Sequence, residues 1–188
     1  VGFGGLEFND FIDAHRVLGI SRMTSIERNQ GLVHRLELNK PYAGMKILIG
    51  EARDQLPLVD WTIPAIIWLD YMDALTRDIL RDVEYVVRKA LPGSLLVVTL
   101  NADLGSALSA RLEQLRTNLD DLAPTAVTKD DLADWGVADV QRSVLFEQAD
   151  LYSNEKNKSG VHQILDIGYK DSARMQTWAG VLSSPVTA

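Results

Sequence analysis

The chain has 188 residues, and its hydrophobic fraction of 46% and charged fraction of 24% are those of an ordinary globular domain. Its formal net charge of −7 argues against a broad phosphate-binding surface, so nucleic acid is not a favoured partner. Without cysteine the chain has no disulfide, thiolate metal site or cysteine nucleophile, which suits a cytoplasmic location, and no apolar run approaches the roughly 20 residues of a membrane span.

The chain opens on a short glycine-rich stretch. Gly2, Gly4 and Gly5 form this stretch, and apolar residues at helical spacing then predict a helix over residues 7–18. There is no initiator methionine, and a loop-like sequence comes at once. We therefore expect the chain to enter at the end of a first strand that is cut short.

Two short strands with a helix between them come next. Residues 22–26 predict a strand that ends on Glu27, and residues 29–38 predict a helix capped by their first residue, an asparagine. Residues 45–50 predict the following strand, which leads directly into Glu51. Both strands thus end on or just before an acid.

The most apolar stretch lies at residues 65–69 and ends abruptly on Asp70 and Tyr71. A strand without a polar break predicts burial on both faces, as in a parallel sheet covered by helices. An acid at its carboxyl end lies where open α/β sheets bind their ligands. A helix over residues 73–91 and a strand over residues 95–100 complete a strand–helix–strand unit.

The remaining chain changes character toward its end. Leucines at helical spacing predict a helix over residues 104–119, and a second helix is predicted over residues 140–152, with an acidic and irregular segment between them. Residues 161–169 and 173–182 are strand candidates joined by a tight polar turn. This pattern predicts an antiparallel hairpin.

The glycines and the first acid allow a specific chemical interpretation. Glycines let a backbone approach a ligand closely, and an acid about 20 residues further on can accept both hydroxyls of a ribose. Glu27 stands at this distance from Gly2, Gly4 and Gly5, although Glu7 prevents a complete G-x-G-x-x-G pattern. The alternative interpretation is a tight turn followed by an ordinary surface acid.

This order of elements resembles the class I S-adenosylmethionine-dependent methyltransferases over nearly the full chain. The resemblance implies one three-layer, Rossmann-like α/β domain over residues 1–188, mostly parallel, with an antiparallel C-terminal hairpin. It also implies that the glycine-loop strand lies beside the Asp70 strand, inside the sheet. A plain nicotinamide-binding domain would not end on such a hairpin.

The resemblance further implies S-adenosylmethionine as cofactor and a set of site residues. The residues implied to bind the cofactor are Gly2, Gly4, Gly5, Glu27, Glu51, Ala52, Asp70 and Tyr71. Asp70 is also the catalytic candidate, as the group that orients or deprotonates the methyl acceptor. No metal is expected: Asp70 and Asp73 are spaced to share a divalent ion, but helix capping by Asp73 is the simpler account.

Three functions stay open at this point. The first is an O-directed methyltransferase with an unknown small-molecule or macromolecular acceptor. The second is a catalytically inactive, methyltransferase-like module with a protein partner, suggested by the incomplete glycine pattern and the acidic residues 120–139. The third, disfavoured by the hairpin, is a nicotinamide-dependent oxidoreductase.

Overall fold

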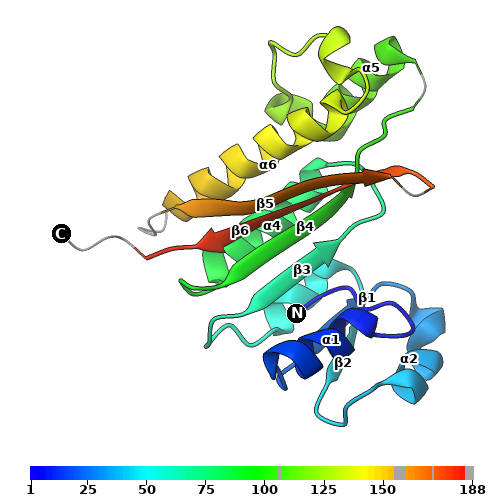
Figure 1. Cartoon of the computed structure of the whole chain (residues 1–188), viewed down its shortest axis with the longest axis vertical. Coiled ribbons are helices and arrows are strands. Elements are labelled where there is room, and N and C mark those ends of the chain that lie inside the picture. The colour runs from blue at the N-terminus through cyan, green and yellow to red at the C-terminus, as the bar shows by residue number, and fades with distance from the viewer. Residues whose placement is uncertain (106, 155–159, 171, 185–188) are drawn as a thin grey trace. The chain divides into compact units, whose positions relative to one another are not determined.

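The computed structural model divides the chain into two compact units, residues 1–60 and 61–188, each with its own strands and core (Figure 1). The residues that the structure describes are 1–105, 107–154, 160–170 and 172–184. The single domain expected from the sequence stays a prediction. Within the described ranges, no helix is long and apolar enough to cross a membrane.

The first unit is built around two parallel strands, β1 (Thr24–Glu27) and β2 (Lys46–Ile49). Its helical elements are α1 (Asn9–Leu18), the 3-10 turn η1 (Gln30–Leu32), α2 (Val33–Asn39), the short α3 (Ala52–Gln55) and η2 (Leu56–Leu58). Asn29 caps η1, because its side-chain oxygen accepts a hydrogen bond of 2.9 Å from the Gly31 N–H. The strands and helices predicted for this part of the sequence are confirmed.

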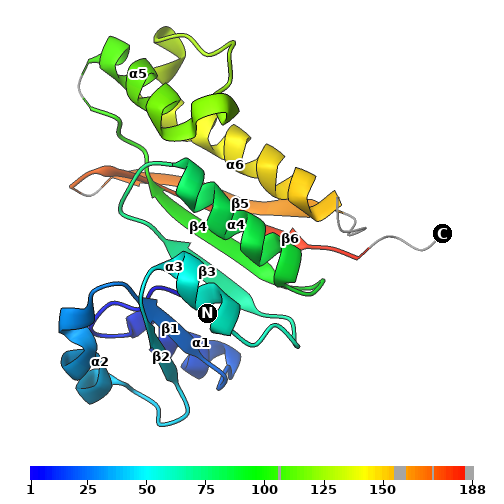
Figure 2. The same ribbon diagram turned by 180° about the vertical axis from the view of Figure 1, so that it is seen from behind.

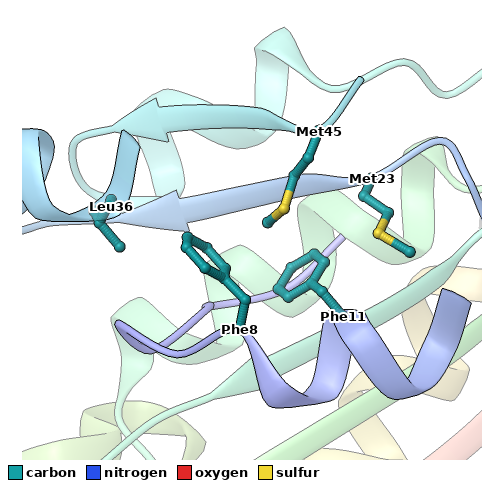
Figure 3. Packing of buried hydrophobic residues seen from close by; sticks show 5 residues of the cluster. All are labelled: Phe8, Phe11, Met23, Leu36 and Met45. Carbon is teal, nitrogen blue, oxygen red and sulfur yellow. The ribbon is translucent and has the colours of Figure 1, made fainter. Parts of the chain in front are cut away.

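Five buried side chains form the core of the first unit. Figure 3 shows that they come from the region of α1, from α2 and from the residues just before β1 and β2. They are Phe8, Phe11, Met23, Leu36 and Met45. The two phenylalanine rings meet edge to face, with centroids 6.0 Å apart. Phe8 has a φ of 52°, which is unfavourable for a bulky residue, and its complete burial holds it there.

The second unit contains a four-stranded sheet in the order β3-β4-β6-β5. Its strands are β3 (Ile66–Asp70), β4 (Leu95–Asn101), β5 (Val161–Lys170) and β6 (Arg174–Leu182). β3 and β4 pair in parallel, whereas β6 is antiparallel to both β4 and β5. The predicted α/β class and terminal hairpin are therefore confirmed, although Asp171 in the predicted turn lies outside the described residues.

The helices α4 and α6 lie on the same face of this sheet, as Figures 1 and 2 show from opposite sides. The helical elements of the second unit are α4 (Arg77–Lys89), α5 (Leu108–Leu119), η3 (Asp120–Leu122), η4 (Asp130–Leu132) and α6 (Gly136–Asn154). α4 buries a regular apolar stripe that comprises Ile79, Leu80, Val83, Val86 and Val87. α6 begins four residues before its predicted start, so the irregular acidic segment is shorter than expected.

β3 differs from the sequence-based expectation in its burial. Its burial alternates: Ile67 and Leu69 are buried, but Trp68 is 39% exposed and Asp70 is exposed. Trp68 is thus not a core residue. Within the four-stranded sheet β3 is the terminal strand, and its expected place beside the glycine-loop strand stays a prediction. The uninterrupted apolar run could not reveal that α4 and α6 cover only one face.

A second correction concerns the start of α4. The cap is Thr76, whose hydroxyl accepts a hydrogen bond from the Ile79 N–H at 3.3 Å, and not Asp73. A threonine is as suitable a cap as an aspartate, so residue type alone could not decide between the two positions.

One buried amide joins two loops of the second unit to α6. Gln141 is fully buried; its Oε1 accepts from the Leu75 N–H at 2.6 Å, and its Nε2 donates to the Asn101 carbonyl at 3.1 Å. Leu75 lies in the segment after β3, and Asn101 ends β4. A single side chain therefore bonds the backbone of the segment after β3 and the backbone at the end of the neighbouring strand β4.

We predict that Gln141→Leu lowers the free energy of unfolding by about 2–4 kcal/mol, because a buried donor and a partly buried acceptor each lose their partner. Gln114→Leu is the matched control: the Gln114 amide bonds Asn118 on an exposed face, and its loss should cost less than about 0.5 kcal/mol. Urea unfolding of both variants measures the difference. Equal losses would contradict the anchoring role of Gln141.

Candidate functional site

Three of the predicted segments meet at the carboxyl end of the β1–β2 pair. The Gly2 N–H donates to the Thr24 carbonyl at 3.1 Å, and the Ile26 N–H donates to the Gly2 carbonyl at 2.9 Å, so the glycine stretch runs beside β1. On the other side, the Gly50 N–H donates to the Glu27 carbonyl at 2.9 Å. Glu27 is thus flanked by the glycine stretch and by the segment that leads to Glu51.

Gly4 and Gly5 play different parts in this arrangement. The Gly4 N–H donates to the Ser25 hydroxyl at 3.1 Å, and a Cβ at Gly4 would lie 2.6 Å from that oxygen and 2.8 Å from the Phe8 ring. A Cβ at Gly5 would meet nothing within 4 Å. Gly4 therefore allows close packing of the stretch against β1, whereas Gly5 faces open space.

Glu27 ends β1 with a half-buried carboxylate. Its Oε1 accepts a hydrogen bond of 2.7 Å from the Asn29 N–H, which shapes the turn into η1. No bond to its Oε2, and no ion pair with Arg28 or Arg35, is found in the part of the chain that the structure describes. The carboxylate thus has one structural partner and one oxygen available for a ligand.

Glu51 and Ala52 follow β2 as predicted. Glu51 is exposed, and its carbonyl accepts hydrogen bonds from the N–H groups of Asp54 and Gln55, at 3.0 and 3.1 Å. Ala52 is buried at the start of α3. Gly50 has a φ of +144°, a backbone conformation that favours glycine, and this turns the chain from β2 toward Glu51.

Asp70 and Tyr71 lie at the end of β3 in the second unit. Asp70 is exposed and sits opposite Thr99 of β4. The Tyr71 hydroxyl donates to Asp82 Oδ2 on α4 at 2.8 Å. Burial, and after it the negative charge of Asp82, raises the pKa of Tyr71 well above its usual range. Tyr71 therefore stays a neutral phenol whose hydroxyl is held by α4.

The end of β4 brings further polar groups to the same edge as Asp70. The Asn101 N–H donates to the Asp73 carbonyl at 3.0 Å, and Asn101 Oδ1 accepts from the Asp103 N–H at 2.8 Å. The sequence showed only that Asn101 ends an apolar strand, and that polar break was the available signal. Among the described residues no three His, Asp or Glu side chains are grouped to hold a metal ion.

Comparison with known proteins agrees with this architecture. The model of the family described as "Putative O-methyltransferase" matches residues 1–187. No curated protein matches the sequence significantly.

Solved structures with a similar fold include three that are informative. Cofactor-bound Rv0187 from MTB has a TM-score of 0.58 and 16% identity, over 97% of this chain and 72% of that chain. The O-methyltransferase TomG from Streptomyces achromogenes is involved in tomaymycin synthesis and was solved in complex with SAM. It has a TM-score of 0.55 and 17% identity, over 97% of this chain and 72% of that chain. The Haloferax volcanii complex of the Trm112 methyltransferase activator with a protein named as "the putative methyltransferase" has a TM-score of 0.59 and 10% identity, over 100% of this chain and 82% of that chain. The Rossmann-like methyltransferase fold expected from the sequence is confirmed.

We predict that Gly4→Ala destabilises the first unit by about 1–3 kcal/mol, because the new methyl group would overlap the Ser25 hydroxyl and the Phe8 ring. Gly5→Ala is the matched control, since its methyl group enters open space, and we expect a change of less than about 0.5 kcal/mol. Thermal and urea unfolding measure both. The packing role of Gly4 is wrong if the two variants are equally stable.

Proposed function

Because the chain belongs to the family described as "Putative O-methyltransferase", we propose that it transfers the methyl group of S-adenosylmethionine to an oxygen atom of its acceptor. The observation that carries this proposal is the convergence of the glycine stretch, Glu27 and Glu51 at the carboxyl end of β1 and β2. Two structures that share the fold support the choice of cofactor: Rv0187 is cofactor-bound, and TomG is in complex with SAM.

In the first unit, we propose that the carboxylate of Glu27 holds the ribose. Its Oε2 accepts hydrogen bonds from ribose hydroxyls, while Oε1 stays on the Asn29 N–H. Gly2, Gly4 and Gly5 have no side chains, so the backbone beside Glu27 can approach the cofactor closely, and Gly5 borders open space. The residues that follow β2, Glu51 and Ala52, are proposed to border the adenine.

In the second unit, we propose Asp70 as the catalytic residue. The cofactor, when bound, supplies an electrophilic methyl group on its sulfonium. Asp70 accepts a hydrogen bond from the acceptor hydroxyl, orients its oxygen and takes its proton as the oxygen is methylated. Tyr71 is proposed to contact the cofactor through its ring or backbone, because its hydroxyl is engaged by Asp82.

A second candidate function is that of a protein-binding methyltransferase subunit. The Haloferax volcanii "putative methyltransferase" of similar fold was solved with an activator protein, and this supports the proposal of a protein partner here as well. The methyl acceptor is not indicated by any residue. A cytoplasmic location is proposed from composition, since the chain has no cysteine.

Isothermal titration of the whole chain with S-adenosylmethionine tests the cofactor directly. We expect one saturable site. A parallel titration with NADH should show no binding, because nicotinamide chemistry is the competing interpretation of the glycine–acid spacing. Binding of NADH without binding of S-adenosylmethionine would overturn the proposed function.

We predict that Glu27→Gln weakens S-adenosylmethionine binding by about tenfold and Glu27→Ala by about a hundredfold or more. The glutamine can still accept from the Asn29 N–H but lacks the charge, whereas alanine loses both. Glu37→Gln is the control, since Glu37 pairs with Lys40 on an exposed face of α2. Unchanged affinity in a folded Glu27→Ala protein would reject the ribose role.

A further inference from the structure

β5 is an edge strand with an apolar and accessible surface. It pairs only with β6 among the described strands, and Figure 1 shows it at the outer edge of the sheet. Residues 162–170 are all exposed, including Ile164 at 59%, Ile167 at 48% and Tyr169 at 43%. Proteins usually blunt such edges, because the free backbone groups of the outer side can pair with another strand.

The regular part of this edge begins after a bulge at Ile164. From there the side chains alternate between the two faces of the sheet. Ile167 sits opposite Thr177 and shares the face of the exposed Trp68, whereas Asp166 sits opposite the buried Trp178, on the helix-covered face. One face of the edge is therefore apolar and the other is polar.

We propose that β5 binds β5 of a second copy of this chain in an antiparallel ladder, with the two-fold axis at Gly168. In this register each Asp166 lies opposite Lys170 of the partner, so that opposite charges face each other twice. On the other face, each Ile167 lies opposite Tyr169 of the partner, which is a favourable aromatic–β-branched pair. The edge is thus complementary to itself in both charge and apolar surface.

The charges select this register over its neighbours. An axis at Asp166 would place two carboxylates directly opposite each other, which is destabilising. An axis at Ile167 would leave both Asp166 and Lys170 without an opposite charge across the ladder. Within the chain Asp166 already lies 3.3 Å from Arg142, so the partner's lysine extends an existing ion pair.

An aromatic side chain lies close to the proposed axis. A Cβ at Gly168 would come within 3.0 Å of the Trp135 ring, so this ring packs over the glycine backbone. Trp135 is partly exposed, and the Arg174 guanidinium lies 5.8 Å from its ring centroid. Tryptophan, tyrosine and arginine are enriched where protein interfaces gain most of their energy.

The size of the surface predicts a weak association. A ladder over residues 166–170 with its flanking side chains is small beside the roughly 1,600 Å² of a standard interface. We therefore expect a dimer that dissociates on dilution, measured by sedimentation equilibrium or light scattering over a range of concentrations.

The absence of cysteine from the chain permits a sharp test of the register. A mixture of Ile167→Cys and Tyr169→Cys proteins should form a disulfide-linked dimer under mild oxidation, because these positions are directly opposed. Each variant alone should cross-link much less, because its thiols would lie diagonally and beyond disulfide distance. Val17→Cys mixed with Leu58→Cys, two exposed positions of the first unit, is the matched control.

Ile167→Asp should weaken the dimer by about tenfold or more, corresponding to about 1.4 kcal/mol. Its circular dichroism and its affinity for S-adenosylmethionine should match those of the unmodified chain, so loss of the dimer is distinguishable from failure of the proposed function. A monomer at all concentrations would overturn the proposal. So would cross-linking of Ile167→Cys alone, or cross-linking of the control pair to the same extent.

Discussion

Parallel pairing is the constraint on which the arrangement of this protein depends. Parallel neighbours run in the same direction, so their carboxyl ends must lie at one edge of the sheet. This holds separately for β1 with β2 and for β3 with β4. It is the reason that Glu27 and the segment that leads to Glu51 lie side by side in the first unit, although they are far apart in the sequence.

Buried polar contacts then hold these strand ends in place. In the first unit the Ser25 hydroxyl fixes the backbone of Gly4 beside β1. In the second unit Gln141 bonds the backbone of Leu75, which follows β3, and of Asn101, which ends β4. A buried polar group without a hydrogen-bond partner costs free energy in a low-dielectric interior, so these contacts favour one loop conformation over many. A site that acts mainly by holding two reactants in line depends on this kind of order.

The two faces of the sheet in the second unit differ, because helices cover one face and leave apolar side chains exposed on the other. α4 and α6 cover one face, where Leu69 and Trp178 are buried. On the opposite face the Trp68 Nε1–H donates to the Thr99 hydroxyl at 3.0 Å, and the surface continues to Ile167 at the β5 edge. In this sheet the proposed catalytic residue, Asp70, lies at the carboxyl end of β3, whereas the proposed dimer contact lies along the outermost strand, β5.

The sequence by itself determined the elements and the acids that end them. Apolar periodicity located the strands and α4, and a polar residue after each apolar run marked Glu27, Glu51 and Asp70, because these signals depend only on neighbours along the chain. Only the tertiary structure decided the exposure of Trp68 and the engagement of the Tyr71 hydroxyl by Asp82. The physical reason is that the burial of a side chain and its hydrogen-bond partner depend on which distant element covers that face. The sequence of an apolar strand does not reveal whether helices cover one of its faces or both.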